Sequence, residues 1–279
     1  MYPALSPGAI GVGLPFEETA KLAAAAGFKG ISIDIGVAAA DPDGVRRVLE
    51  RNKLLPAAWG LPVEFRKDDE AFKQGLPRLA ECAKAGKQIG ADRCSTWILP
   101  FSDSLPFERN FGSHRDRLRA CAEVLADHGC RLGLEFVGPQ TARAGHPNEF
   151  VFTQDGMLKL CEAIGTGNCG LLFDSFHWYT SHGIPEDILR LSDALVVDVH
   201  INDGAEGRGP DEQIDNDRRL PGESGVIDLT SFLKNLKEIG YTGPVTPEPF
   251  SAKLRGMSPA DAVNATAAAL LDVWQKAGV

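Results

Sequence analysis

Four side chains that can bind a metal ion end successive apolar runs between residues 131 and 248. Glu135, Asp174, His200 and Glu248 each lie at the last position of such a run or one residue before it. One such residue alone is usually a helix cap or an ion-pair partner. Three carboxylates that converge, however, are costly to bury and repel one another unless a cation lies between them. Three oxygen ligands and one imidazole predict one divalent metal, with Mn²⁺ as the first choice and Mg²⁺, Co²⁺ or Zn²⁺ as alternatives.

Short apolar runs alternate with amphipathic segments along the chain, and these elements must position the four side chains. The runs that predict strands cover residues 9–12, 30–34, 56–60, 93–98, 131–136, 170–174, 194–201 and 244–248. The segments that predict helices cover residues 16–28, 41–52, 71–89, 115–128, 155–164, 184–191, 229–239 and 258–276. Eight strand–helix units in one chain of 279 residues predict an α/β fold, a (β/α)8 TIM barrel, as a single domain over residues 1–279.

The predicted barrel explains why the four residues should meet. The carboxyl ends of its strands all open toward the active site, and the four residues fall at the ends of strands five to eight. A doubly wound open sheet is the competing fold, but no GxGxxG motif follows the first expected strand. Two connections are long, and loops of this length are usually functional. They are residues 138–152 and residues 203–223. Within the second, we expect the acidic segment 204–217 to be a mobile lid that covers the site.

Composition narrows the class of partner. The net charge of −9 disfavours a nucleic-acid partner, because phosphate backbones are repelled by such a surface. The sequence contains no run of about 18 apolar residues, which is the length a membrane-spanning helix needs. Its N-terminus lacks the basic segment and apolar stretch of a signal peptide, so we expect a cytoplasmic protein. The six cysteines form no CxxC pair and are expected to be reduced core thiols. Composition leaves a homo-oligomer open.

Five segments carry a resemblance to a known family. They read LEFVG at 134–138, FDSFH at 173–177, VHIND at 199–203, DRRLPGESG at 217–225, and GY at 240–241 leading to EPF at 248–250. The chain resembles the xylose-isomerase-like sugar phosphate isomerase/epimerase superfamily. It is most similar to the inosose (2-keto-myo-inositol) isomerase branch, with ketose 3-epimerases close behind. The resemblance is strong over residues 130–250 and lies only in the pattern of elements before that.

The resemblance implies roles for individual residues. It makes the four metal-binding candidates the ligands, and Glu135 and Glu248 the groups that take and return a proton. It assigns His177 and Arg218 to the oxygens of the substrate, although Arg219 is a rival for Arg218. Aromatic faces often pack against sugar rings, and Trp59 and Trp97 fall near the ends of strands three and four, where they could line the pocket. The 138–152 loop offers further residues that could touch the substrate: Gln140, Arg143, His146 and Asn148.

These roles imply an enzyme that uses a divalent metal to isomerise or epimerise a keto-sugar or keto-inositol. The reaction would move a proton through a metal-stabilised enediolate of a small polyhydroxy ketone. The first alternative is a metal-dependent lyase or dehydratase, because the same enolate can expel a hydroxyl group. A DNA-repair endonuclease of the same fold needs three metals and more than the six histidines present. A metal-binding module without catalysis is the remaining alternative.

Overall fold

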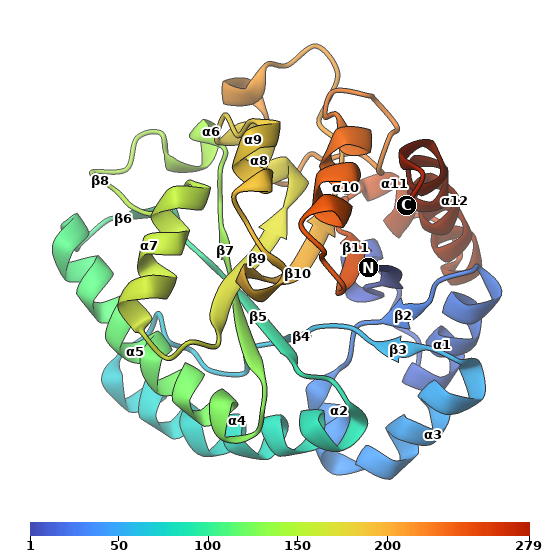
Figure 1. Cartoon of the computed structure of the whole chain (residues 1–279), viewed down its shortest axis with the longest axis horizontal. Helices are drawn as coiled ribbons and strands as arrows, with labels where there is room; N and C mark the ends of the chain where they lie inside the picture. Colours follow the sequence, from blue (N-terminus) through green and yellow to red (C-terminus); the bar gives the residue numbers. More distant parts are fainter.

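Parallel strands form a closed barrel at the centre of the molecule, and helices cover its outside (Figure 1). The computed structural model describes residues 1–279. Neighbouring strands follow the order β3-β2-β1-β11-β10-β9-β7-β5-β4. The strands are β1 (Tyr2–Leu5), β2 (Gly30–Ile31), β3 (Leu55–Pro56), β4 (Trp59–Gly60), β5 (Arg93–Ile98), β7 (Arg131–Phe136), β9 (Cys169–Asp174), β10 (Val196–Ile201) and β11 (Pro244–Pro247).

The third position of the barrel is one strand interrupted in its middle. β3 pairs with β2, and β4 pairs with β5. Between them the Ala57 N–H donates to the Ile31 carbonyl, and the Ala58 carbonyl accepts from the Ile33 N–H. These bonds close the ring, so β3 and β4 together complete eight parallel positions. The predicted (β/α)8 TIM barrel is therefore confirmed.

Helices, all but one of them ten residues or longer, alternate with the strands and pack around the barrel. They are α1 (Phe16–Ala25), α3 (Pro42–Asn52), α4 (Asp69–Ile89), α5 (Phe107–Asp127), α7 (Gln154–Ile164), α9 (Pro185–Leu189), α10 (Leu229–Glu238) and α12 (Pro259–Ala277). Shorter elements lie in the connections: α2 (Ile35–Ala40), α6 (Gln140–Arg143), α8 (Ser175–Thr180), α11 (Ala252–Arg255), the pair β6 (Phe101–Ser102) and β8 (Asn148–Glu149), and the 3₁₀ turns η1 (Gly8–Ile10), η2 (Asp193–Leu195) and η3 (Pro210–Glu212).

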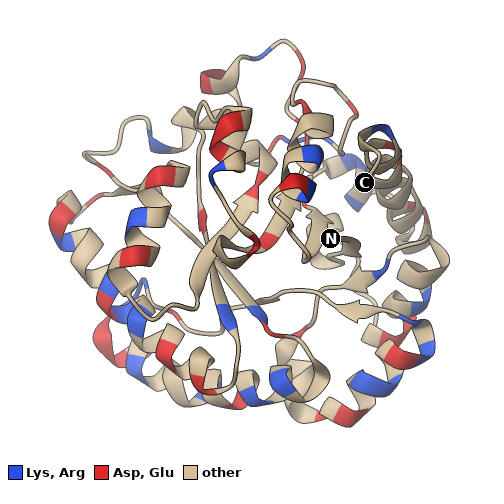
Figure 2. Cartoon of the chain, viewed as in Figure 1, with Lys and Arg blue, Asp and Glu red and all other residues tan.

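Polar side chains start several helices by binding N–H groups of the first turn. Asp34 and Asp41 do so for α2 and α3, and Ser258 does so for α12. Buried side chains of strands and helices form one contiguous core of 62 residues that runs from β1 to α12. Lys and Arg alternate with Asp and Glu along the outer helices, whereas the central strands are largely uncharged (Figure 2). None of the helices combines the length and the hydrophobicity that a membrane-spanning segment needs.

The predicted first strand is wrong. Residues 9–12 were expected to form it, but the structure places the strand at Tyr2–Leu5 and a 3₁₀ turn at Gly8–Ile10. Two prolines obscure the true strand in the sequence. Pro3 still fits the sheet because its carbonyl accepts a hydrogen bond from the Lys29 N–H. The backbone N–H that proline lacks would lie at the start of the strand, before the pairing with β2 begins. Pro7 and Gly11, which has a φ of 77°, then bracket the turn.

Candidate active site

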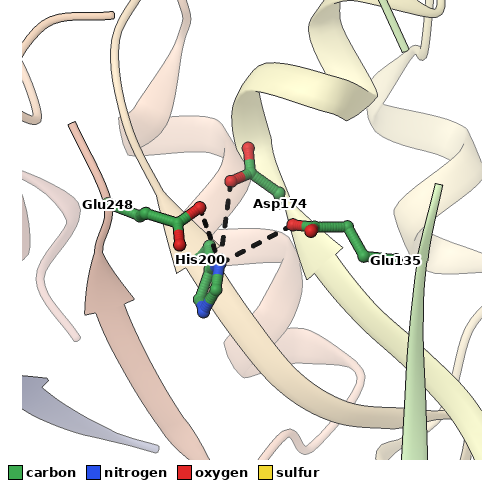
Figure 3. A group of neighbouring side chains, drawn as sticks. All are labelled: Glu135, Asp174, His200 and Glu248. Atoms are coloured by element: carbon green, nitrogen blue, oxygen red, sulfur yellow. Dashed lines mark ion pairs between the residues drawn. The ribbon is translucent and has the colours of Figure 1, made fainter. Parts of the chain in front are cut away.

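Four strand ends carry the predicted metal-binding residues to one point (Figure 3). Glu135 comes from β7, Asp174 from β9, His200 from β10, and Glu248 directly follows β11. One ligand atom of each residue lies within 4.8 Å of the others. The expectation that these four side chains meet is therefore confirmed, because adjacent parallel strands deliver their last residues to the same edge.

His200 stands at the centre of the group. Its Nδ1 lies 3.3 Å from Glu248 Oε2, 3.6 Å from Glu135 Oε1 and 4.0 Å from Asp174 Oδ2. Both His200 Nδ1 and Glu135 Oε1 are buried and have no hydrogen-bond partner. Buried polar atoms are rarely left unpaired, so each such atom calls for an explanation. A cation bound by the four side chains would satisfy both atoms, and the donor set therefore fits a divalent metal.

Burial and the neighbouring charges shift the pKa values of these four residues in opposite directions. Burial raises the pKa of Glu135 above its usual range. Burial also opposes ionisation of Asp174 and Glu248. For Asp174 the nearby positive charges, led by Arg218, outweigh burial and lower its pKa, and for Glu248 those of His200 and Arg218 do the same. Burial disfavours the charged form of His200, but the surrounding carboxylates raise its pKa well above the usual value. The site is thus a dense cluster of ionisable groups with shifted pKa values, as is common at functional sites.

Arg218 lies beside the cluster and is only 2% exposed. One terminal nitrogen donates to Asp174 Oδ2 at 3.0 Å and to Glu248 Oε2 at 3.3 Å. The other donates to Asp215 Oδ1 at 2.7 Å. Its rival Arg219 instead pairs with Asp217 at the surface. Of the two arginines, the structure therefore brings Arg218 to the site.

His177 lies next to Arg218 at the start of α8. Its Nδ1 accepts a hydrogen bond from the Gly138 N–H at 3.2 Å, so the proton of a neutral imidazole resides on Nε2. Arg218 places a second donor 3.1 Å from this Nε2. Two donors then face each other, and an oxygen atom that accepted from both would relieve the contact. Gly138 is required here because a Cβ would overlap the His177 carbonyl.

Asn202 is a site residue that we did not predict, although it lies within the VHIND segment. It is fully buried. Its side-chain nitrogen donates to Asp174 Oδ2 at 2.9 Å, and its side-chain oxygen accepts from the Glu248 backbone N–H at 2.6 Å. Asn202 therefore fixes two of the four candidate ligands relative to each other. Its position in the VHIND segment, two residues after His200, was the only feature of the sequence that could have indicated this role.

We expect Asn202→Ala to weaken metal binding about 10- to 100-fold, because groups that orient metal ligands usually contribute that much. The loss of two buried hydrogen bonds should also lower the melting temperature. Competition with a fluorescent chelator measures the affinity. Asn148→Ala is the matched control, since the Asn148 side chain donates to the Ser102 carbonyl away from the cluster. Equal affinities in the two variants would contradict the role of Asn202.

A cavity of about 550 Å³ opens beside the cluster, on the side of the first strands. His200 and Asp198 line it from β10, and Ser95 lines it from β5. Trp59 also lines it, but its indole N–H donates to the Ala91 carbonyl at 3.0 Å and the ring is almost fully buried. Trp97 pairs in register with Glu135, is 46% exposed and packs under the guanidinium of Arg66. Substrate contact by either tryptophan stays a prediction.

The two long loops lie at the same end of the barrel and contact each other. The Thr141 hydroxyl in the first donates to the Gln213 carbonyl in the second. Asp215 of the second loop reaches Arg218 and lies 3.7 Å from His177 Nε2, so this loop borders the site. Its mobility stays a prediction. In the first loop, three of the predicted substrate contacts form hydrogen bonds within the protein. Arg143 bonds to the Gly138 carbonyl, Asn148 to the Ser102 carbonyl, and His146 to Asp103.

Known proteins show the same sequence pattern and fold. An inosose isomerase from Bacillus velezensis is 33% identical over 198 residues, which cover 71% of this chain and 68% of that protein. A 3-dehydroshikimate dehydratase from Pseudomonas aeruginosa is 29% identical over 253 residues, which cover 85% of this chain but 36% of the dehydratase.

Solved structures agree with this relationship. A xylose isomerase domain protein from Alicyclobacillus acidocaldarius superposes over 100% of both chains with a TM-score of 0.90 at 28% identity. The IOLI protein, solved with a zinc atom, shares the fold over 99% of both chains with a TM-score of 0.82 at 22% identity. Residues 20–274 match the family described as "Xylose isomerase-like TIM barrel". The chain therefore belongs to the xylose isomerase-like TIM barrel family.

Proposed function

We propose that this protein is a divalent-metal-dependent isomerase or epimerase of a keto-sugar or keto-inositol. The observation that carries the proposal is the convergence of Glu135, Asp174, His200 and Glu248 beside a cavity. The inosose isomerases among its relatives support the substrate class. His177 Nε2 and a terminal nitrogen of Arg218 lie 3.1 Å apart beside the cluster, where both could donate to a substrate oxygen.

The four clustered side chains would hold the metal. Oxygen-rich sites with one imidazole suit Mn²⁺, which is our first choice. The zinc atom in the IOLI protein supports a divalent ion in this fold and keeps Zn²⁺ as an alternative. When bound, the ion supplies Lewis-acid polarisation of a substrate carbonyl.

The residues of the chain would then move the proton. Glu135 and Glu248 come from strands separated by β9 and β10, and Figure 3 shows them on opposite sides of His200. One carboxylate removes the proton from the carbon next to the carbonyl, and a carboxylate returns it. If both act, from opposite faces, the product is an epimer. If one shuttles the proton between neighbouring carbons, the product is an isomer. His177 Nε2–H and Arg218 would stabilise the negative charge that develops on oxygen.

A lyase is the second candidate, and the dehydratase among the relatives favours it. Both reactions begin with the same proton removal. They differ in the next step, since a lyase expels a hydroxyl group as water, whereas an isomerase returns the proton to carbon. The product mass therefore separates them.

The test is incubation of the metal-loaded protein with a panel of keto-inositols and ketoses in deuterated water. We expect deuterium at a carbon next to the carbonyl, detected by NMR, and a product of unchanged mass when ordinary water is used. A product whose mass is lower by one water molecule would show that the enzyme is a lyase and not an isomerase. Metal bound at the cluster with no exchange on any member of the panel would favour a binding module and contradict both enzymes.

A further inference from the structure

The cavity beside the cluster has a distinct chemical character. It extends from His200 and Asp198 across the barrel mouth to the ends of β1 and β2. The metal candidates come from β7 and β9–β11, so the cavity occupies the other half of the mouth. A substrate held at the cluster by its carbonyl end would therefore place the rest of its carbon skeleton over the first strands.

The lining of this half carries hydroxyls and carboxylates but no Lys or Arg. Hydroxyl groups come from Ser6, Ser32 and Ser95, and carboxylates from Asp34 and Asp198. Such a surface can bind the hydroxyl groups of a polyol by donating and accepting hydrogen bonds. At the end away from His200 it disfavours a phosphate or a carboxylate, because the carboxylate of Asp34 carries the same charge. Arg218, which lies at the cluster, does not line this half of the mouth.

Asp34 is the outermost carboxylate of this lining. It follows β2 and caps α2, where its Oδ1 accepts from the backbone N–H groups of Gly36 at 2.9 Å and Val37 at 3.3 Å. Both bonds use the same oxygen, which leaves Oδ2 for a ligand. The cap also fixes the side chain in one orientation, so the carboxylate is held in place before a substrate arrives.

We infer that Asp34, with Ser6 and Ser32, binds the hydroxyl groups of the substrate that lie farthest from the metal, and that it restricts the enzyme to uncharged polyhydroxy ketones. This inference rests on the proposed function and deepens it. It makes Asp34 a specificity-determining residue: it accepts a hydrogen bond from a substrate hydroxyl and excludes an anionic group from the same place. It also disfavours 3-dehydroshikimate, the substrate in the name of the dehydratase relative, since that molecule carries a carboxylate.

The test compares the neutral ketone that exchanges fastest in the deuterium panel with its phosphate ester, using the metal-loaded protein. We expect the wild type to prefer the neutral compound at least about 100-fold in kcat/KM, because like-charge contacts are strongly unfavourable. Asp34→Asn should lower kcat/KM for the neutral compound about 10- to 100-fold, mainly through KM, since a hydrogen bond to a charged group is lost. In the same variant, the ratio of kcat/KM for the neutral compound to kcat/KM for its phosphate ester should fall at least about tenfold.

Asp41→Asn is the matched control. Asp41 also caps a helix, is exposed and does not line the cavity. Asparagine is as good a helix cap as aspartate, so both variants should keep the wild-type melting temperature. The control should keep both kcat/KM values within about twofold of wild type, as is usual for surface changes away from a site.

Each outcome of this comparison decides one claim. A wild type that processes the phosphate ester or 3-dehydroshikimate as well as the neutral ketone overturns the inference but leaves enolisation, and with it the proposed function, intact. Unchanged kinetics in a folded Asp34→Asn protein overturn the role of Asp34. Absence of exchange on every ketone, neutral or charged, defeats the proposed function and the inference that rests on it.

Discussion

Glu135→Gln and Glu248→Gln are each expected to lower turnover by about 100- to 10,000-fold. Glutamine keeps an oxygen at nearly the same position but cannot accept a proton, and general acid–base groups typically contribute factors of 10² to 10⁴. Because one oxygen ligand remains, metal should be retained in part. Steady-state rates on the best ketone, together with metal analysis of each variant, measure the two effects separately. Glu50→Gln is the control, because Glu50 is exposed on the outer helix α3.

The two variants also distinguish an epimerase from an isomerase. In an epimerase with two carboxylates on opposite faces, one variant should still exchange a substrate hydrogen with solvent, since the half-reaction of the remaining carboxylate survives. In an isomerase with a single shuttle, the variant of that carboxylate should lose exchange and turnover together. Turnover at the wild-type rate in either variant would show that the carboxylate in question transfers no proton.

Asp174→Ala should remove the metal and destabilise the protein. The Asp174 side chain is fully buried and pairs with Arg218 at 3.0 Å. It also caps α8 through the Phe176 and His177 N–H groups. Breaking a buried ion pair costs about 3–5 kcal/mol, because the remaining charge stays buried, and a lost helix cap adds about 1 kcal/mol. In this variant Arg218 keeps Asp215 and Glu248 as partners, so we expect the lower end of that range.

Metal analysis and thermal unfolding with and without a chelator test this expectation. Chelation should lower the melting temperature of the wild type, since a ligand that binds only the folded state stabilises it. The same treatment should leave Asp174→Ala unchanged. Asp174→Asn serves as the second variant, because asparagine still caps α8 while the charge is removed. Full metal content in Asp174→Ala would contradict the proposed ligand set.

The sequence alone was sufficient to predict the fold class and the four clustered residues. Both follow from local patterns that survive folding. The predicted strands at 93–98 and 131–136 coincide with β5 and β7. β7 is buried over Leu132–Phe136 and so needs apolar side chains there, whereas β5 buries only Cys94 and Ile98. In a parallel barrel the strand ends converge, so a residue type at a strand end predicts a position in space without knowledge of any loop.

The first strand and the start of α5 were not predictable in the same way. The strand at Tyr2–Leu5 contains a proline, which usually argues against a strand. α5 begins at Phe107 rather than at residue 115, because Phe107 and Phe111 of its first turns stack on each other, and Phe107 also packs against Phe150, which is distant in the sequence. In both places the contacts with neighbouring elements override the local pattern.

Only the tertiary structure decided which loop side chains enter the site. Arg218 and Arg219 are adjacent in sequence, yet the backbone of Arg219 pairs with Asp203, and this bridge turns the Arg218 side chain inward. Asn202 joins Asp174 to Glu248 across three strands, and Asp34 reaches the cavity from the other half of the barrel. These placements depend on hydrogen bonds between residues far apart in the chain. The spacing before Pro221-Gly222 favoured Arg218 over Arg219, but no spacing predicted the contacts of Asn202 or Asp34. A loop side chain takes its direction from the partners that folding brings to it.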